Sequence, residues 1–526
     1  MAHFKWKTIL VLLVVLGFNF RVSALEEIYI DGPPTILITN VMIYDGTGSK
    51  PFRGQVRIRG DRILDVEQGD QPQLSSDSQV IDGKGLDLAP GFIDTHSHHD
   101  IDLDIEPNAS ALITQGVTTI VRGVDGFSDA PMNRGEYFSV NNFFGYFHFV
   151  PIAINVASFS AHNSIRLEVM GEDFKRTATK EELKEMSSLV EADMLAGAYG
   201  ISTGLEYDPG LYSSTEEMIE LAKIAAKYNG KYKSHIRSED RRYWEAIEEI
   251  IEIGRQAKIP VNIDHFKLNG TFNWGRTDEI LSILESARAE GINITADVYP
   301  YEAWSSSITT LYPERNFDDL DEAKYILDKL SSAEDITFVY HSLHPEYIQK
   351  TVAEIAKEAG IPETLMLSKL CKESYELSTP ESPVEYVVAK GMIDSDVRFL
   401  LNWPFSNVTS DGELVCSHPR GCGTFPKVIS KYRGQDGLGS LERIIYKMTH
   451  LSATNIGLKD RGVIKEGAFA DIVIFDAQNT KDNSTFSNSN LKSEGIHSVW
   501  VNGTKVLNNG EFTDELPGRI LLKNKE

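Results

Sequence analysis

The chain has 526 residues, and its 77 acidic against 52 basic side chains give a formal net charge of −25. This charge excludes nucleic acid as a partner, because such binding depends on Lys and Arg that neutralise phosphates. At 41% hydrophobic and 25% charged residues, the composition is that of a globular protein and excludes collagen-like, disordered and polytopic membrane proteins. Three cysteines in so long a chain exclude a disulfide-based fold. A large acidic enzyme fits these limits best.

The first 24 residues are typical of a secretory signal peptide. Lys5 and Lys7 precede an apolar run over 9–20, and small residues follow at 22–24. The run is short for a membrane span, so we expect cleavage after Ala24, export to the periplasm or the medium, and no stable membrane insertion afterwards. An uncleaved N-terminal anchor is the alternative.

The sequence does not decide whether the cysteines are oxidised. Cys416 and Cys422 flank a short, turn-prone stretch and could pair in an oxidising compartment, which would leave Cys371 free. Free thiols throughout are an equally compatible alternative.

Both ends of the mature chain alternate short strand-like runs with turns. The runs lie at 35–42, 55–63 and 79–82 near the N-terminus and at 471–475 and 498–505 near the C-terminus. Neither end has enough strands for a stable sheet. We therefore expect one small β-sandwich domain built from residues 25–88 and 459–526.

The central residues 89–458 alternate strands with amphipathic helices. Repeated βα units predict an α/β fold with a parallel sheet, and their number favours a (β/α)₈ TIM-like barrel. A doubly wound open sheet is the alternative, but no Gly-x-Gly-x-x-Gly opens a helix. Between about 304 and 399 the rhythm breaks over a stretch too long for a βα loop, so we expect an insertion over the barrel mouth.

Four histidines predict a metal site. His96 and His98 follow an apolar run and, in an extended backbone, point to one face, whereas His99 points to the other. His235 and His265 each close a predicted barrel strand. The carboxyl ends of barrel strands meet at one face, where such barrels keep their active sites, so these side chains are expected to converge on a cation.

Asp411 is the candidate general base. It follows residues 399–403, which we take as the last barrel strand. From that strand's end its carboxylate would reach a water at the metal. An Asp before Gly is otherwise a common turn residue.

With these residues the chain resembles the amidohydrolase superfamily and, within it, the N-acyl-D-amino-acid deacylase (D-aminoacylase) family. The resemblance covers nearly all of the mature chain. It is carried by the segments Gly91–His98, Gly116–Thr119, Gly200–Gly204, Ser234–Arg237, Trp274–Arg276, Asp297–Tyr301, His418–Arg420, Gly423–Pro426, Lys459–Gly462 and Gly467–Asp471. The His-Pro-Arg and Gly-Thr-Phe-Pro strings are the most specific to the deacylases.

The resemblance implies a metal-dependent hydrolase with a small-molecule N-acyl amino acid as substrate, of D configuration. It assigns His96 and His98 to one metal position and His235 and His265 to the other, with one or two Zn²⁺ ions. It makes Asp411 the general acid/base. It also places Lys267, Tyr299 and Arg420 near the substrate's carboxylate, where cationic donors suit an anionic group.

One position departs from the family pattern. Many members carry a metal-binding cysteine after the second strand, and here Asp125 stands there. A bridging ligand must then be a carboxylate, either Asp125 or its rival Glu206 after the fourth strand. We expect zinc first, and with an oxygen ligand in place of a thiolate the site would also suit manganese or another divalent ion.

Other functions remain compatible with the sequence. A cyclic amidase or a dipeptidase of the same superfamily would share the fold, although the His-Pro-Arg string disfavours both. A catalytically inactive binding protein would typically have lost metal ligands, and here all four histidines and Asp411 are present. The sequence leaves a homo-oligomer open.

Overall fold

The computed structural model describes residues 35–69, 78–128, 138–380, 382–434 and 437–523. The predicted signal peptide, residues 1–24, lies outside them. Within the described ranges, no helix combines the length and apolar character that crossing a bilayer requires.

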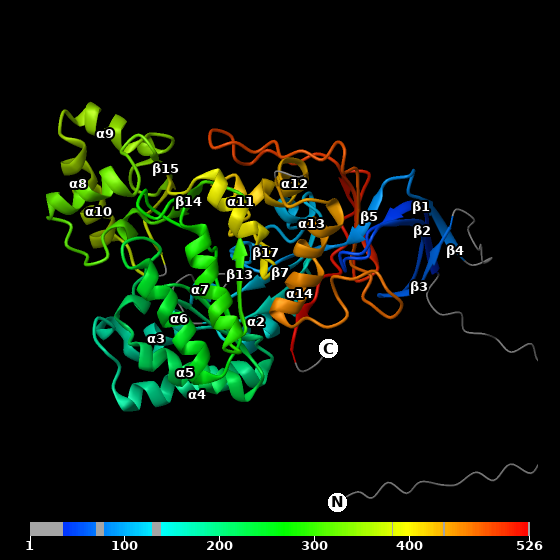
Figure 1. The fold of residues 1–526 in the computed structure, drawn as a ribbon, viewed down its shortest axis with the longest axis horizontal. Coiled ribbons are helices and arrows are strands. Elements are labelled where there is room, and N and C mark those ends of the chain that lie inside the picture. Colours follow the sequence, from blue (N-terminus) through cyan, green and yellow to red (C-terminus); the bar gives the residue numbers. More distant parts are fainter. Residues whose placement is uncertain (1–34, 70–77, 129–137, 381, 435–436, 524–526) are drawn as a thin grey trace, which may run out of the picture.

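Strands from both ends of the chain form one nine-stranded sheet (Figure 1). Ile472 pairs antiparallel with Pro90, which joins the two ends. Apolar residues on one face, including Ile38, Ile58 and Trp500, form a separate small core. The strands are β1 Thr35–Ile43, β2 Phe52–Arg59, β3 Arg62–Gln68, β4 Ser78–Asp82, β5 Asp87–Pro90, β18 Ile472–Phe475, β19 Ile496–Val501, β20 Thr504–Asn508 and β21 Glu511–Phe512.

The central strands pair in parallel and form two sheets. One holds β6 Phe92–Asp94, β7 Val117–Arg122, β8 Asn155–Ser158 and β22 Ile520–Leu521; the other holds β9 Ser160–Ala161, β10 Gly200–Gly204, β11 Lys231–His235, β12 Val261–Ile263, β13 Ile294–Val298 and β17 Ser406–Val408. Backbone hydrogen bonds connect them at Tyr199 N to Ser158 O (2.9 Å) and Asp411 N to His96 O (3.0 Å). The carboxyl ends of these strands therefore lie at one edge.

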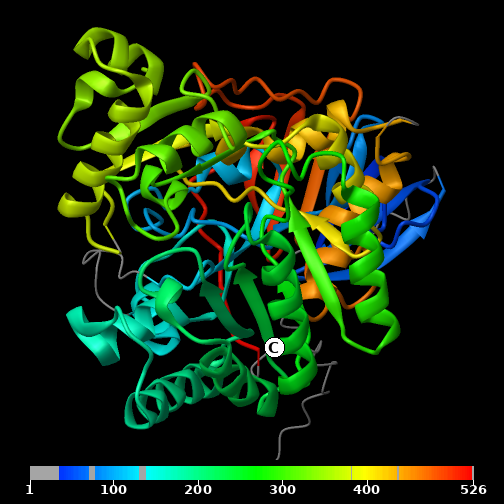
Figure 2. The same ribbon diagram turned by 60° about the vertical axis from the view of Figure 1, so that its left-hand side comes forward.

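Amphipathic helices cover the parallel strands (Figure 2). In α5, for example, Ser214 accepts a hydrogen bond from the Glu217 backbone N–H, and Met218, Leu221 and Ala225 are buried. The helices of this region are α1 Ser110–Ile113, α2 Val140–Phe147, α3 His162–Met170, α4 Lys180–Ala196, α5 Thr215–Lys227, α6 Tyr243–Ala257, α7 Thr277–Ala289, α11 Asp394–Asn402, α12 Arg420–Lys431, α13 Leu441–Met448 and α14 His450–Ile456, with 3₁₀ turns η1 Gly171–Asp173 and η2 Gly210–Tyr212.

The prediction that 399–403 forms the last strand is wrong. Residues 399–402 end helix α11, which buries Val397, Leu400 and Leu401, and the strand is β17, a few residues later. A short apolar run does not distinguish a strand from a buried helix face, which explains the error.

The expected insertion is a small unit with its own antiparallel sheet. Strand β16 Glu385–Lys390 pairs with β14 Ala303–Ser306 on one side and β15 Ile336–His341 on the other. Around it lie η3 Ile308–Leu311, η4 Pro345–Tyr347, α8 Leu320–Lys329, α9 Val352–Ala359 and α10 Glu363–Leu377, far from β1–β4 in Figure 1. Helix α11, of which the predicted insertion included residues 394–399, contacts β13 and β17 instead.

Cys416 and Cys422 form a disulfide, and Cys371 is a buried free thiol. Of the two alternatives that the sequence leaves open, the structure has the paired one. The disulfide links the turn after β17 to the first turn of α12, the helix that begins at Arg420.

Candidate metal centre

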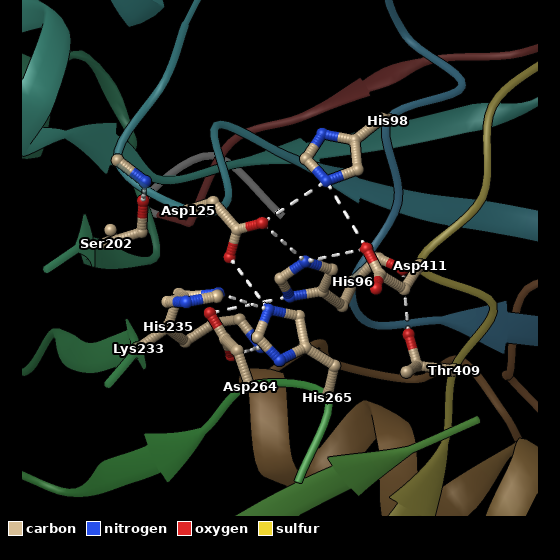
Figure 3. Close-up of polar contacts among 12 residues, drawn as sticks. His96, His98, Asp125, Ser202, Lys233, His235, Asp264, His265, Thr409 and Asp411 are labelled. Atoms are coloured by element: carbon tan, nitrogen blue, oxygen red, sulfur yellow. Dashed lines mark hydrogen bonds and ion pairs between the residues drawn. The ribbon is translucent and has the colours of Figure 1, made fainter. Parts of the chain in front are cut away.

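Two histidines and two carboxylates meet where β6 ends. His96 and His98 each place Nε2 3.4 Å from Asp125 Oδ2, and their distances to Asp411 Oδ1 are 3.5 and 3.4 Å. The structure therefore brings together four of the predicted residues in one group (Figure 3). His99 turns away, as expected, and contacts Ser97 Oγ and the Gly421 carbonyl.

Asp125 lies between this group and a second one. Its Oδ1 is 3.3 Å from His265 Nε2, which in turn lies 2.9 Å from His235 Nδ1. Figure 3 shows the Asp125 carboxylate with one oxygen toward His98 and the other toward His265. One carboxylate thus belongs to both candidate ligand groups.

The loop after β7 holds Asp125 in this position. Asp125 itself has a φ of +51°, in the left-handed region, and Gly126 follows with a φ of +77°. Ser202 on β10 accepts a hydrogen bond from the Gly126 N–H and donates one to the Gly123 carbonyl. A Cβ at Gly126 would lie 2.2 Å from the Asn163 side chain, so the turn requires glycine.

Glu206 occupies a different place. Its Oε2 lies 3.0 Å from His235 Nε2, the ring nitrogen opposite to the one that faces His265. Glu206 also forms a ligand group with His235 and Glu239, but it is absent from both groups that contain Asp125. It contacts one histidine and does not connect the two pairs.

Three buried atoms of the two groups that share Asp125 make no hydrogen bond within the described residues. These are both ring nitrogens of His96 and Oδ1 of Asp125, none of which makes a hydrogen bond. Buried polar atoms are normally hydrogen-bonded, whereas these face other ligand atoms at 3.3–3.5 Å, so they call for a group that the protein itself does not supply. Imidazole nitrogens and carboxylates are ligands for zinc and other divalent cations, and the donor set fits such an ion.

The charges of the site are strongly coupled. Burial disfavours an imidazolium at His98, yet the adjacent carboxylates of Asp125 and Asp411 raise its pKa to about 10. Burial likewise opposes a carboxylate at Asp411, but the Arg420 guanidinium and the histidines hold its pKa well below the usual range. The acids therefore stay ionised and favour positive charge between them.

Asp411 and the three predicted substrate-binding residues lie beside the histidines. Arg420 Nη1 contacts Asp411 Oδ2 at 2.7 Å, and its guanidinium carbon lies 5.0 Å from the centre of the Tyr299 ring. The buried Tyr299 hydroxyl has no hydrogen-bond partner among the described residues. Lys267 Nζ contacts Glu239 Oε1 at 2.5 Å and His265 Nδ1 at 2.9 Å. Lys267, Tyr299 and Arg420 line a common small cavity with Asp411.

A buried network below the histidines was missed by the sequence analysis. Lys233 Nζ lies 2.7 Å from Asp264 Oδ1 and from Asp297 Oδ2, and Asp264 Oδ2 lies 3.4 Å from His96 Nδ1. Lys233 precedes His235 by two residues on β11, so the two point to the same side. A charged residue two positions before a candidate ligand in a buried strand was the available signal.

Comparison with known proteins finds relatives that match over most of the chain. A model of the amidohydrolase family matches residues 389–507. D-aminoacylase of Alcaligenes xylosoxydans xylosoxydans is 33% identical over 93% of this chain and 98% of its own, and N-acyl-D-aspartate deacylase of the same organism is 32% identical over 92% and 94%. The crystal structure of N-acyl-D-glutamate deacylase from Bordetella bronchiseptica, complexed with zinc and a phosphonate inhibitor, has a TM-score of 0.82 at 30% identity, covering 93% of this chain and 100% of that one. The chain therefore belongs to the D-aminoacylase family of N-acyl-D-amino-acid deacylases, within the amidohydrolases.

Proposed function

We propose that this protein hydrolyses the amide bond of N-acyl-D-amino acids to a carboxylate and a free D-amino acid, with a divalent metal as cofactor. The observation that carries the proposal is the position of Asp125, between His96 and His98 on one side and the His235–His265 pair on the other, next to Asp411. The three relatives described above are all deacylases of D-amino acid derivatives, and the choice of the D configuration depends on them.

The metal would be held at one or two positions. His96 and His98 would form one with Asp125 and Asp411, and His235 and His265 would form the other with Asp125. Asp125 is the shared ligand in this proposal, and Glu206 orients His235 through its other ring nitrogen. Zinc is the first choice, given the zinc-bound relative. A divalent cation held there supplies Lewis acidity, which polarises a carbonyl and makes water more acidic.

Asp411 would act as the general base and then the general acid. Its ionised carboxylate is placed to take a proton from the attacking water and to return it to the leaving amide nitrogen. Arg420, 2.7 Å from the other carboxylate oxygen, keeps Asp411 ionised and oriented. The side chain of His98 is 31% exposed, so the Asp411 side of the centre is open to a substrate.

The substrate's carboxylate would bind in the small cavity that Lys267, Tyr299 and Arg420 line. The free Tyr299 hydroxyl can donate to a carboxylate oxygen, and the guanidinium offers further N–H donors. Lys267 adds positive charge, and through its contact with His265 Nδ1 it also orients that ring. Holding the carboxylate beside Asp411 positions the amide for attack.

The proposal also covers how the chain divides into domains and where the protein is located in the cell. The parallel strands would form a (β/α)₈ barrel over 89–458, and residues 25–88 with 459–526 would form the β-sandwich around the nine-stranded sheet. Residues 1–24 would direct export to the periplasm or the medium. N-terminal sequencing of protein from the host's extracytoplasmic fraction should begin at Leu25, whereas a retained Met1 would contradict cleavage.

A paired substrate screen tests the function directly. Chelated and metal-reloaded enzyme would be assayed on N-acyl-D- and N-acyl-L-amino acids, together with Asp411→Asn. We expect cleavage of the D compounds that depends on added metal, and a loss of about 10²–10⁴-fold in kcat for the variant, the usual contribution of a general base. Unchanged circular dichroism would show that the variant is folded. Cleavage of the L compounds alone, or of neither series, would refute the proposal.

A further inference from the structure

A large cavity lies at the end of the parallel strands opposite to the candidate metal centre. Its volume is about 760 Å³, and we call it the amino-end cavity. Lys231, the first residue of β11, lines it, whereas His235, the last residue of the same strand, belongs to the candidate ligand groups. Residues at the start of β12 and β13 and on helices α7, α13 and α14 form much of its wall. The chemistry proposed above uses only the carboxyl ends of the strands, so the amino-end cavity takes no part in it.

Positive charge predominates in the lining of this cavity. Four of the lining residues are cations that have no carboxylate partner within the described residues, namely Lys231, Arg288, Arg443 and Lys447. Among the described residues that line the cavity, Glu442 is the only acid. Because the whole chain carries a net charge of −25, this local excess of positive charge does not follow from the composition.

Two further charged residues near the cavity already have partners. Lys233 also lines it, but its ammonium group lies between two buried aspartates, as described above, and is neutralised by them. Glu285 precedes Arg288 by one turn of α7 and acts on its charge from outside the lining, where the Glu285 carboxylate accepts a hydrogen bond from Trp403 Nε1 at 2.7 Å. The excess of cations inside the cavity therefore remains.

Two of the four cations keep unused hydrogen-bond donors. Lys231 Nζ donates to the Thr454 carbonyl at 3.1 Å, and its other two N–H groups make no hydrogen bond within the described residues. Arg288 donates from Nη1 to the Ile294 carbonyl, which leaves Nε and Nη2 without a partner in the described part of the chain. Its guanidinium carbon lies 3.3 Å from the centre of the Phe405 ring, and this packing fixes the plane of the group. Ammonium and guanidinium groups with free N–H donors are the usual partners of phosphate oxygens.

The other two cations lie one turn apart on helix α13. Arg443 donates to the side-chain and backbone oxygens of Asn402 at 2.9 and 2.8 Å, and Lys447 Nζ donates to the Trp403 and Ser406 carbonyls at 2.6 Å each. These uncharged acceptors orient both side chains without neutralising them. Burial, together with the charge of Arg443, lowers the pKa of Lys447 to about 7. A nearby anion would offset both effects and favour the protonated form.

We propose that the amino-end cavity binds a doubly charged oxyanion, namely a phosphate group, either as the free ion or as a phosphate monoester. A cavity lined by charges of one sign concentrates ions of the opposite sign. The phosphate would neutralise cations that belong to β11, α7 and α13 and would thereby connect these three elements. It would act on stability, to which this face of parallel α/β barrels usually contributes. The proposal does not depend on the deacylase activity.

Calorimetric titration of the metal-loaded enzyme tests the proposal. Inorganic phosphate, glycerol 3-phosphate and acetate would be compared at constant ionic strength, and we expect both phosphates to bind more tightly than the singly charged acetate. Lys231→Met should weaken phosphate binding by at least about 10-fold, as the loss of a hydrogen bond to a charged group does. Lys231→Arg keeps the charge and should retain binding. Lys184→Met is the matched control, since Lys184 is an exposed cation of α4 outside the lining.

The variants also separate this site from the metal centre, where phosphate can bind to a metal ion. Lys231 and His235 lie at opposite ends of β11, so phosphate bound at the metal would be insensitive to Lys231→Met. Thermal unfolding gives a second readout, because Tm should rise with phosphate in the wild type and less in Lys231→Met. Tighter binding of one of the two phosphates would identify the free ion or the monoester as the ligand. Equal affinity of the wild type and Lys231→Met, binding of acetate as tight as that of phosphate, or no binding of either phosphate would overturn the inference and leave the proposed function intact.

Discussion

The metal centre and the insertion differ in how they are built. The centre lies at the carboxyl edge of parallel strands, where buried histidines and carboxylates contact one another through short, specific distances. The insertion has an antiparallel sheet of its own and presents hydroxyl groups and rings to a wide cavity. The first arrangement fixes charges for chemistry, whereas the second shapes a space. Changes to the centre should therefore affect catalysis for all substrates, and changes to the insertion should affect substrate choice or local stability.

Removal of the metal should have the largest effect, because it disables the centre and leaves the insertion untouched. Dialysis against a chelator is expected to reduce kcat by more than about 100-fold for every substrate. Added zinc should restore it. Rates can be followed by release of the free amino acid, and a chelated enzyme that keeps most of its activity would contradict the assignment of the centre.

Lys233→Met should destabilise the centre's supporting network. The change leaves Asp264 and Asp297 buried without their cation, and breaking a buried ion pair in this way typically costs about 3–5 kcal/mol. Denaturant unfolding measures the loss. Lys231→Met is the matched control on the same strand, since Lys231 Nζ donates to the Thr454 carbonyl and has no carboxylate partner within the described residues. Equal stability of the two variants would show that the network is not what holds this region.

Glu385→Gln should alter the insertion alone, and with a smaller effect. Burial raises the pKa of Glu385 to about 7, although Ser307, Ser374 and the Ile308 N–H hydrogen-bond to it. Because the folded protein holds this proton more tightly than the unfolded chain, the contribution to stability is full below about pH 4.5 and is lost as the pH rises through 7. The wild type should lose about 2 kcal/mol from this group between pH 5 and 8, following the usual energy per pKa unit.

The Gln variant should lack that component of the pH dependence. Thermal unfolding at pH 5 and pH 8 compares the two proteins, and activity at saturating substrate should be unchanged at both pH values. A variant with the same pH slope as the wild type would show that Glu385 does not carry the effect.

The same contrast explains what could be predicted from the sequence. The positions of His96, His235 and His265 follow from a local rule, since parallel strands bring their carboxyl ends together. Their partners do not follow from it. Lys233 and Asp264 meet only through the packing of neighbouring strands, and a buried charge gives no periodic signal of its own.

From the sequence, the insertion could be predicted only as a break in the alternation of strands and helices. Its sheet pairs Ala303 with Lys390, positions far apart in the chain, and no local pattern specifies such a register. Residues 399–403, which mostly belong to α11, were predicted as a strand for a related reason. The apolar run that contains Leu400 and Leu401 is too short to show a helical or a strand period.

The central claim is that Asp125 joins two metal positions, and metal content tests it most directly. Zinc per chain would be measured by mass spectrometry for the wild type, Asp125→Ala and the control Glu206→Gln after equal dialysis. We predict that the Asp125 variant retains less zinc than the wild type and that the Glu206 variant retains nearly the wild-type amount, because the Glu206 carboxylate contacts His235 Nε2 and is absent from both ligand groups that contain Asp125. Loss of zinc in Glu206→Gln with full retention in Asp125→Ala would contradict the account.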